Sequence, residues 1–496
     1  MKFSKLIIAV VAASGFIAAH AQEAPRTAYF LDGYSYRHEL NPAFMGERNY
    51  VSIPMLGNYD ISLFSNVGVN TFLYPVNDPA SKYKLTTFLS PTVDANTFLD
   101  KLNKNNHINA NIDITVLSLG FKAFKGFNTL SVGVHTDMGI NLPKDFFRFM
   151  KIGQDGDNTH YNFKDIKANA TAYGEIALGH SHRINQKLTI GAKLKFLVGL
   201  GNISAHITDM DVRMGPDAWI VNARGKMEMA AGAGLKLPTK AESGAEYDTP
   251  SDADLVDWDN MDYDSFGIAG YGLGVDLGAT YQLLPDLQLS AAINDFGFMN
   301  WQHSYLAETG NKTWTFDGFD NVAIKDTQND YEENKLSEQL DRLGDDFQDM
   351  MNFHRTKGDA SYTKMLNATI RLGAEYKMPF YKNLTGAFLF STHIAGCQSW
   401  TEGRFYANVK PVKWFDATVN YGASTYGSSF GWMLNFHPKG FNFFVGTDHQ
   451  FFRLTPQFAP VGHAMASVNL GFNVTFGSGF DACKPGKASK KKVAKK

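Results

Sequence analysis

The chain has 496 residues and a formal net charge of −2, with 14% aromatic residues, 45 glycines and 2 cysteines. So small a net charge gives no argument for a nucleic-acid partner or against a membrane, and we expect no nucleic-acid partner. Two cysteines cannot supply the disulfide framework that holds small secreted domains together.

Residues 1–21 have the pattern of a secretory signal peptide. Lys2 and Lys5 precede an apolar run over 6–13, and Ala19-His20-Ala21 supplies small residues for cleavage. We therefore expect an exported protein whose mature chain begins at Gln22.

The next segment, residues 22–58, lies ahead of the regular patterns that follow. Its apolar residues Val51, Ile53, Met55 and Leu56 favour one of two arrangements. The segment is an extra strand or periplasmic arm, or it folds back as a plug inside the remaining structure.

From residue 59 to 477 the chain repeatedly alternates apolar and polar residues. The clearest examples are 188–200, 270–282 and 366–378, each a dozen residues or more. Successive side chains of a strand point to opposite faces. Strands of soluble sandwiches usually have about 5 to 6 residues, whereas a tilted strand needs about 9 to 11 to cross a bilayer. Since a sheet in lipid must close on itself, we predict an all-β fold, a transmembrane antiparallel β-barrel with lipid-facing apolar residues.

Connection lengths predict the topology of this barrel, because outer-membrane barrels have short periplasmic turns and longer external loops. Six short turns alternate with seven longer links, which gives 14 strands that begin near Tyr59 and end on the periplasmic side. The short turns fall near 125–128, 185–186, 284–286, 379–383, 411–413 and 437–440, and the longer links are 74–107, 141–167, 202–264, 302–364, 395–403, 422–429 and 451–461. A hairpin through Gly215-Pro216 extends one link without adding a span.

The alternation also predicts which charged side chains face the lumen. These are Asp113, Asp137, Glu175, Lys193, Lys195, Asp276, Arg371 and Glu375, together with His135. Two interpretations stay open: the charges pair with one another and with the plug as a polar core, or they line a path for a solute. Their mixed signs exclude a strongly ion-selective pore.

Two external loops carry patterns of their own. Carboxylates crowd residues 242–264, where a solvated acidic loop and a site for a hard cation are the alternatives, but no ligand order supports a metal site. In the loop 302–364, apolar residues at helical spacing predict an amphipathic helix across the barrel mouth. That helix packs onto the loop core, or it forms a hydrophobic entry groove for a ligand or protein partner. Its apolar residues are Leu336, Leu340, Leu343, Phe347 and Met350.

A family resemblance becomes visible in these residues. Asn41-Pro42-Ala43, the pentapeptide 50–54 and the glycine-aspartate hairpin 276–298 resemble the FadL-like outer-membrane barrels, in a Bacteroidetes branch that includes PorV-like secretion barrels. The resemblance covers most of the mature chain. It implies that an N-terminal segment containing Asn41, Pro42 and Ala43 plugs a 14-stranded barrel.

The last strand, 466–476, carries a second match. Its residues Gly471, Val474 and Phe476 resemble the signal read by the barrel-assembly machinery, which is an expected partner during biogenesis. The chain continues into a lysine-rich tail, 478–496, whose charge predicts disorder in the periplasm. The tail is simply solvated, or it contacts an acidic partner.

Function follows from the barrel rather than from a catalytic motif. Asp295-Phe296-Gly297 matches a kinase tripeptide without the other kinase motifs, so we expect no enzyme and no cofactor. The resemblance implies an outer-membrane protein, embedded in lipid, that transports or binds a hydrophobic or amphipathic small molecule. The alternative is a non-transporting barrel that scaffolds protein partners, as PorV-like proteins do in type IX secretion or envelope assembly.

Overall fold

The computed structural model describes residues 25–52, 54, 56–75, 85–153, 159–215, 219–247, 249–265, 267–309, 313–316, 353–396, 399–450 and 465–477. The expected signal peptide, the lysine-rich tail and the expected external helix with Leu336, Leu340, Leu343, Phe347 and Met350 lie outside the described residues. None of the described helices is long and apolar enough to cross a membrane.

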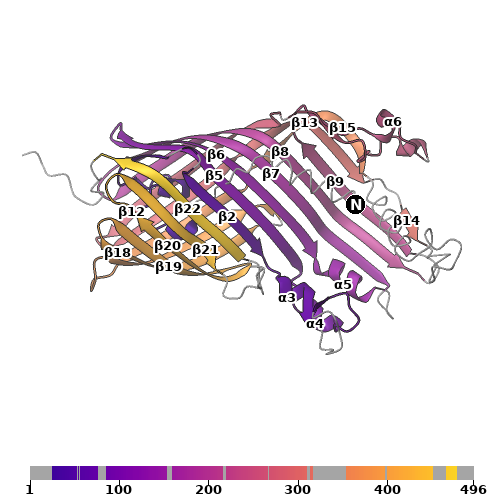
Figure 1. The fold of residues 1–496 in the computed structure, drawn as a ribbon, viewed down its shortest axis with the longest axis horizontal. Helices are drawn as coiled ribbons and strands as arrows, with labels where there is room; N and C mark the ends of the chain where they lie inside the picture. Colours follow the sequence, from indigo (N-terminus) through magenta and orange to yellow (C-terminus); the bar gives the residue numbers. More distant parts are fainter. Residues whose placement is uncertain are drawn as a thin grey trace, which may run out of the picture.

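One antiparallel sheet closes into a barrel (Figure 1). Three of its wall positions hold two consecutive segments each: β1 (Asn49–Ser52) with β2 (Asn58–Ser65), β9 (Trp219–Ala230) with β12 (Gly270–Leu284), and β15 (Phe353–Met365) with β16 (Ala368–Lys377). The remaining wall strands are β5 (Asn105–Ala123), β6 (Gly126–Pro143), β7 (His160–Arg183), β8 (Leu188–Met214), β13 (Leu287–Thr309), β17 (Leu384–Ile394), β18 (Trp400–Val412), β19 (Phe415–Ser424), β20 (Gly427–Phe436), β21 (Phe441–Gln450) and β22 (Met465–Phe476). The wall therefore has the predicted 14 strands.

The barrel closes where its first strand pairs with its last. Asn58 of β2 lies opposite Gly471 of β22, and Ser65 lies opposite Ile108 of β5. No strand edge is left at this seam, as a sheet in lipid requires.

The wall begins earlier than the expected Tyr59. Asn49–Ser52 already pair with β22 and with β5, ahead of the expected boundary at residue 58. The sequence does not reveal this strand because β1 has only four residues of alternation.

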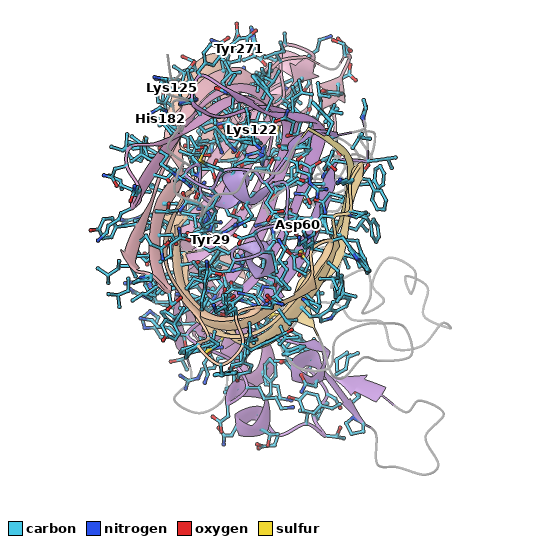
Figure 2. The ribbon with its side chains drawn as sticks, turned by 90° about the vertical axis from the view of Figure 1, so that its left-hand side faces the viewer. Tyr29, Asp60, Lys122, Lys125, His182 and Tyr271 are labelled. Carbon is cyan, nitrogen blue, oxygen red and sulfur yellow. The ribbon has the colours of Figure 1, made fainter. Side chains whose placement is uncertain are left out.

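Side-chain direction follows the alternation. Leu194, Phe196, Leu273 and Leu277 of β8 and β12 are exposed on the outer surface, while the side chains between them are buried inside. Figure 2, a view along the barrel, shows Tyr29 and Asp60 inside the ring of strands and Tyr271 on its outer side. An apolar exterior and a polar interior are the arrangement of a transmembrane barrel.

The wall is much taller on one side than on the other. β8 has 27 residues and β7 has 24, whereas β19 and β20 have 10 each. At the end opposite the short turns, which we call external, β9 forms the predicted hairpin with β8 and pairs with β13. We call β9, β14 (Thr313–Phe316) and residues 202–214, 302–309 and 353–365 the external arm.

An apolar cluster that includes Phe163, Met210, Met227, Leu237 and Phe353 holds the external arm together. Beside it, α3 (Val69–Phe72), α4 (Ala95–Leu99) and α5 (Lys144–Ile152) share a second cluster.

One link that we expected to be longer, 422–429, is instead a tight turn, because the pairing of β19 with β20 continues to Ser424 and Gly427.

Candidate functional site

The N-terminal segment lies inside the barrel. Its 3-10 helix η1 (Arg26–Ala28) and its short helix α2 (Arg37–Leu40) are almost wholly buried. The Tyr29 hydroxyl lies 3.1 Å from the hydroxyl of Ser290 on β13, and the Asn294 amide donates to the Glu39 carbonyl at 3.0 Å. The segment thus contacts β13, which lies between two wall strands that carry predicted lumen charges, β12 and β16.

Asn41, Pro42 and Ala43 are buried against two glycines of the wall. A Cβ at Gly278 would lie 2.0 Å from Asn41 Oδ1, and a Cβ at Gly191 would lie 2.1 Å from the Pro42 carbonyl oxygen. The Asn41 amide also donates to the Ala291 carbonyl at 3.2 Å. A Cβ would overlap the Pro42 backbone at Gly191 and the Asn41 side chain at Gly278, so the close approach of the segment favours glycine at both wall positions.

A second set of contacts holds the start of the segment to β18 and β21. Arg26 pairs with Glu402 at 3.3 Å and with Asp448 at 3.4 Å, and Arg404 donates to Glu402 at 2.6 Å. The backbone N–H groups of Arg26 and Thr27 donate to the Asp448 carboxylate at 2.9 and 2.7 Å. We call Arg26, Glu402, Arg404 and Asp448 the arginine network; all four are buried.

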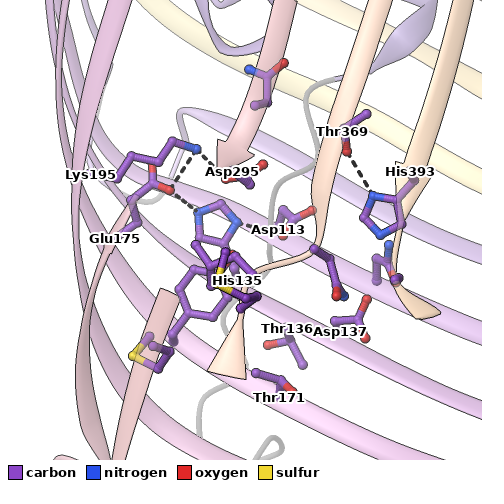
Figure 3. A pocket seen from close by; sticks show the side chains of 18 of the residues that line it. Asp113, His135, Thr136, Asp137, Thr171, Glu175, Lys195, Asp295, Thr369 and His393 are labelled. Carbon is purple, nitrogen blue, oxygen red and sulfur yellow. Dashed lines mark hydrogen bonds and ion pairs between the residues drawn. The ribbon is translucent and has the colours of Figure 1, made fainter. Parts of the chain in front are cut away.

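Beside the N-terminal segment, the lumen contains a cavity of about 160 Å³ (Figure 3). Its wall comes mainly from β5, β6, β7, β8, β13, β15 and β16, and Glu39 of the N-terminal segment contributes from inside. The lining is strongly charged but also holds apolar side chains, namely Tyr173, Met299, Trp301 and Leu366.

Most of the predicted lumen charges meet in one ion-pair cluster around Lys195. Its ammonium lies 2.6 Å from Asp295, 3.1 Å from Asp276 and 3.2 Å from Glu175. His135 joins Glu175 at 3.5 Å to Asp113 at 3.0 Å, and Lys193 lies 3.9 Å from Asp276. This inner cluster is a closed set of opposite charges, as buried charges require.

The other predicted lumen residues lie around this cluster. Arg371 lines the cavity and donates to Asn294 at 2.7 Å, and Asp137 lines the cavity toward the external end. Glu375 is buried but does not line the cavity. The structure therefore brings seven of the eight predicted Asp, Glu, Lys and Arg positions to the cavity or its ion pairs and places one, Glu375, elsewhere.

Asp295 is a site residue that alternation alone misses. A β-bulge between Val275 and Leu277 places one extra residue in β13, and Asp295 adopts a φ of 59° there. Its backbone N–H donates to Asp276 at 2.7 Å, and its side chain reaches Lys195. A bulge re-aims a side chain, which is why counting every second residue does not identify this position as a lumen residue.

A family model covers most of these elements. The model, described as a family of unknown function (DUF5723), matches residues 42–448. The chain belongs to this family. No match was found among curated proteins.

Solved structures with a similar barrel were also found for this DUF5723 protein. The toluene transporter TbuX of Ralstonia pickettii is 11% identical, with a TM-score of 0.40, over 93% of this chain and 97% of that chain. The toluene transporter TodX of Pseudomonas putida is 9% identical, with a TM-score of 0.37, over 92% and 95%. A Pseudomonas aeruginosa FadL homologue is 9% identical, with a TM-score of 0.35, over 92% and 99%.

The acidic external loop of the DUF5723 protein uses its carboxylates for local structure. Asp257 accepts from Ser243 at 2.5 Å and from Asn260 at 2.7 Å. Partial burial opposes ionisation, but these hydrogen bonds lower the pKa of Asp257. Glu242 completes a capping box with Thr239 at the start of α6 (Lys240–Ser243). Within the described residues, no group of three His, Cys, Asp or Glu side chains is arranged to hold a metal ion.

The residues of the expected assembly signal lie on β22. Val474 and Phe476 are exposed on the outer surface, while Gly471 packs against the wall, where a Cβ would lie 2.1 Å from the Gly57 carbonyl oxygen. Their role in recognition by the assembly machinery stays a prediction.

Proposed function

We propose that this DUF5723 protein is an outer-membrane barrel that binds small amphipathic molecules in its lumen and passes them when the N-terminal segment moves. The observation that carries the proposal is the cavity, which combines charged groups with Tyr173, Met299, Trp301 and Leu366 beside the N-terminal segment. Binding sites for small molecules are typically such concave pockets with apolar walls and a few placed polar groups. The ionic lining disfavours a purely hydrophobic solute.

The route in this proposal depends on residues 22–58 as a plug. The contacts of Asn41, Pro42 and Ala43 with Gly191 and Gly278 support that role, because they fill the space beneath the cavity. Movement of the segment would have to break both these contacts with Gly191 and Gly278 and the arginine network.

The test compares the full mature chain with a variant that lacks residues 22–48, which keeps β1 in the wall. In planar bilayers, removal of the plug should convert a closed barrel into one with steady conductance. Equal conductance of the two proteins would contradict the plug and the route. Mass spectrometry of the detergent-purified full chain should detect a bound amphipathic molecule.

A second candidate function is a scaffold for protein partners, and the external arm favours it. Its sheet extends well past the strand length that a bilayer needs, since β8 alone has 27 residues. In this case native pull-downs should recover the same partners reproducibly, and the purified barrel should carry no small molecule. The lysine-rich tail would then offer a periplasmic contact for an acidic partner.

A further inference from the structure

The external part of the cavity holds charged groups that form no direct ion pair among the described residues, although the charge of Glu228 on β9 acts on Lys364. Lys167 of β7 and Lys364 of β15 line the cavity, and neither makes an ion pair or a side-chain hydrogen bond in the part of the chain that the structure describes. Asp137 of β6 accepts one hydrogen bond, from Asn169 at 3.1 Å, and makes no ion pair there either. We call Asp137, Lys167 and Lys364 the outer charge set. Figure 3 shows Asp137 on the opposite side of the pocket from Lys195 and Glu175.

These three groups face a common space. The charges of Lys167, Lys364 and His393 all act on the Asp137 carboxyl, yet no ammonium of the set lies within 4.0 Å of it. Opposite charges in a partly desolvated site gain by pairing, and leaving them unpaired is costly. A set held apart in this way is complementary to a molecule that carries both signs of charge.

The surroundings of Asp137 fit an ammonium group. Asn111 on β5 lies directly across from Asp137, and Asn169 follows on β7. The Oδ1 atoms of Asn111 and Asn169 are buried and accept no hydrogen bond. With the Asp137 carboxylate they provide three acceptors, which is the number that the three N–H groups of a primary ammonium require.

The surroundings of the two lysines fit a carboxylate. Two ammonium groups on facing strands can each donate to one oxygen of a carboxylate, and such charge-assisted bonds are the strong ones. Tyr173, Met299 and Trp301 line the same cavity and offer an apolar wall to a side chain.

We propose that the outer charge set binds the zwitterionic end of an amino acid or a short peptide. The ammonium lies at Asp137, Asn111 and Asn169, and the carboxylate lies between Lys167 and Lys364. This inference rests on the proposed function, since it names the class of amphipathic molecule that the lumen binds.

The first experiment measures binding to the full chain in detergent by isothermal titration calorimetry. The probes are L-phenylalanine, 3-phenylpropionate, which lacks the ammonium, and L-phenylalanine amide, which lacks the carboxylate. L-phenylalanine should bind about tenfold or more tightly than either analogue, because each analogue leaves one charged partner unpaired. Equal affinity of the three probes, or no binding of any, would overturn the proposal.

Variants assign the two halves of the site. Asp137→Asn should abolish the preference for L-phenylalanine over 3-phenylpropionate, and the pair Lys167→Gln with Lys364→Gln should abolish its preference over the amide. Lys164→Gln is the matched control, since Lys164 lies on β7 but is exposed. The preferences of the control should match those of the unaltered chain. Heat-modifiable gel mobility checks that each variant barrel is folded. If the folded Asp137→Asn variant and the folded lysine double variant both keep the preferences of the unaltered chain, the proposed site is contradicted.

Measuring solute flux through the barrel in liposomes distinguishes failure of this inference from failure of the proposed function. If liposomes containing the plug-deleted barrel pass no solute while the full chain still prefers L-phenylalanine, transport fails and the site stands. If an uncharged aromatic solute passes and the three probes bind alike, the route stands and the site fails.

Discussion

Around Arg26 and Arg404, each charged group lies within hydrogen-bond or ion-pair distance of a group of opposite sign, and Asp448 also accepts two backbone N–H groups. Around Lys167 and Lys364, on the other side of the same lumen, the charges face space. Both sets are enclosed by the same barrel, but the arginine network is fully buried whereas the outer charge set is only half-buried. The difference fits a structural role for the arginine network and the solute-binding role that we propose for the outer charge set.

The largest effect should come from breaking the arginine network. Arg404→Met leaves Glu402 buried beside one remaining arginine, and removing one partner of a buried pair costs about 3–5 kcal/mol. Urea unfolding of the barrel in lipid vesicles, followed by tryptophan fluorescence, measures the loss. An unfolding free energy equal to that of the unaltered barrel would remove the structural role assigned to the network.

A steric change should act on the N-terminal segment more than on the wall. Gly278→Ala places a methyl group against Asn41 and Pro42, and overpacking of this kind costs about 1–3 kcal/mol. Limited proteolysis should then cleave within residues 25–48 at protease concentrations that leave the unaltered protein intact. Gly403→Ala is the control, because a Cβ there meets only the edge of Phe388 at 3.4 Å. Equal resistance of the two variants to proteolysis would contradict the close packing of Asn41 and Pro42 against Gly278.

Removal of a charge from the outer set should raise the free energy of unfolding, whereas breaking the arginine network should lower it. Lys364→Met takes away an unpaired, half-buried ammonium, so the free energy of unfolding should rise by about 1 kcal/mol rather than fall. The same urea titration measures it. If Lys364→Met lowered the free energy of unfolding as much as Arg404→Met, Lys364 would have a structural partner. The arginine network and the outer charge set would then not differ in their role.

The smallest effect is expected at an exposed ion pair of the external arm. Arg355 donates to Glu242, and this hydrogen bond lowers the pKa of the Glu242 carboxyl. A depressed folded-state pKa stabilises the fold above the unfolded-state value, and the contribution is lost as the pH falls through the folded-state value. Because Glu242 is half-exposed, Glu242→Gln should cost below about 1 kcal/mol at neutral pH and nothing in acid. Proteolysis of the external loop at the two pH values tests the sign, and a larger difference in acid would refute it.

The strand pattern was predictable because every wall strand must alternate between lipid and lumen. Leu194, Phe196, Leu273 and Leu277 show that alternation in the sequence and face outward in the structure. The external arm was harder to foresee, because above the membrane both faces of a strand can be polar. β8 therefore seemed to end near residue 201 but continues to Met214.

The site was predictable only where the alternation was unbroken. Glu175 and Lys195 followed from it, and Lys167 shares the parity of Glu175 on β7, so the signal for Lys167 was present. Asp295 was hidden by a bulge that depends on pairing with a distant strand. Glu39 lies in a segment without a repeat, and its place beside the cavity depends on how the segment folds back.

The long ladder between β7 and β8 has a mechanical consequence. Its pairing runs from Arg213, at the hairpin tip, to Thr189, near the periplasmic turn, with one irregularity beside Tyr173. Lys167 and Glu175 lie along this ladder, so the hairpin tip and the cavity wall are mechanically joined through one hydrogen-bonded ladder. In the proposed scaffold, a partner bound to the projecting sheet would therefore hold the same two strands that line the cavity.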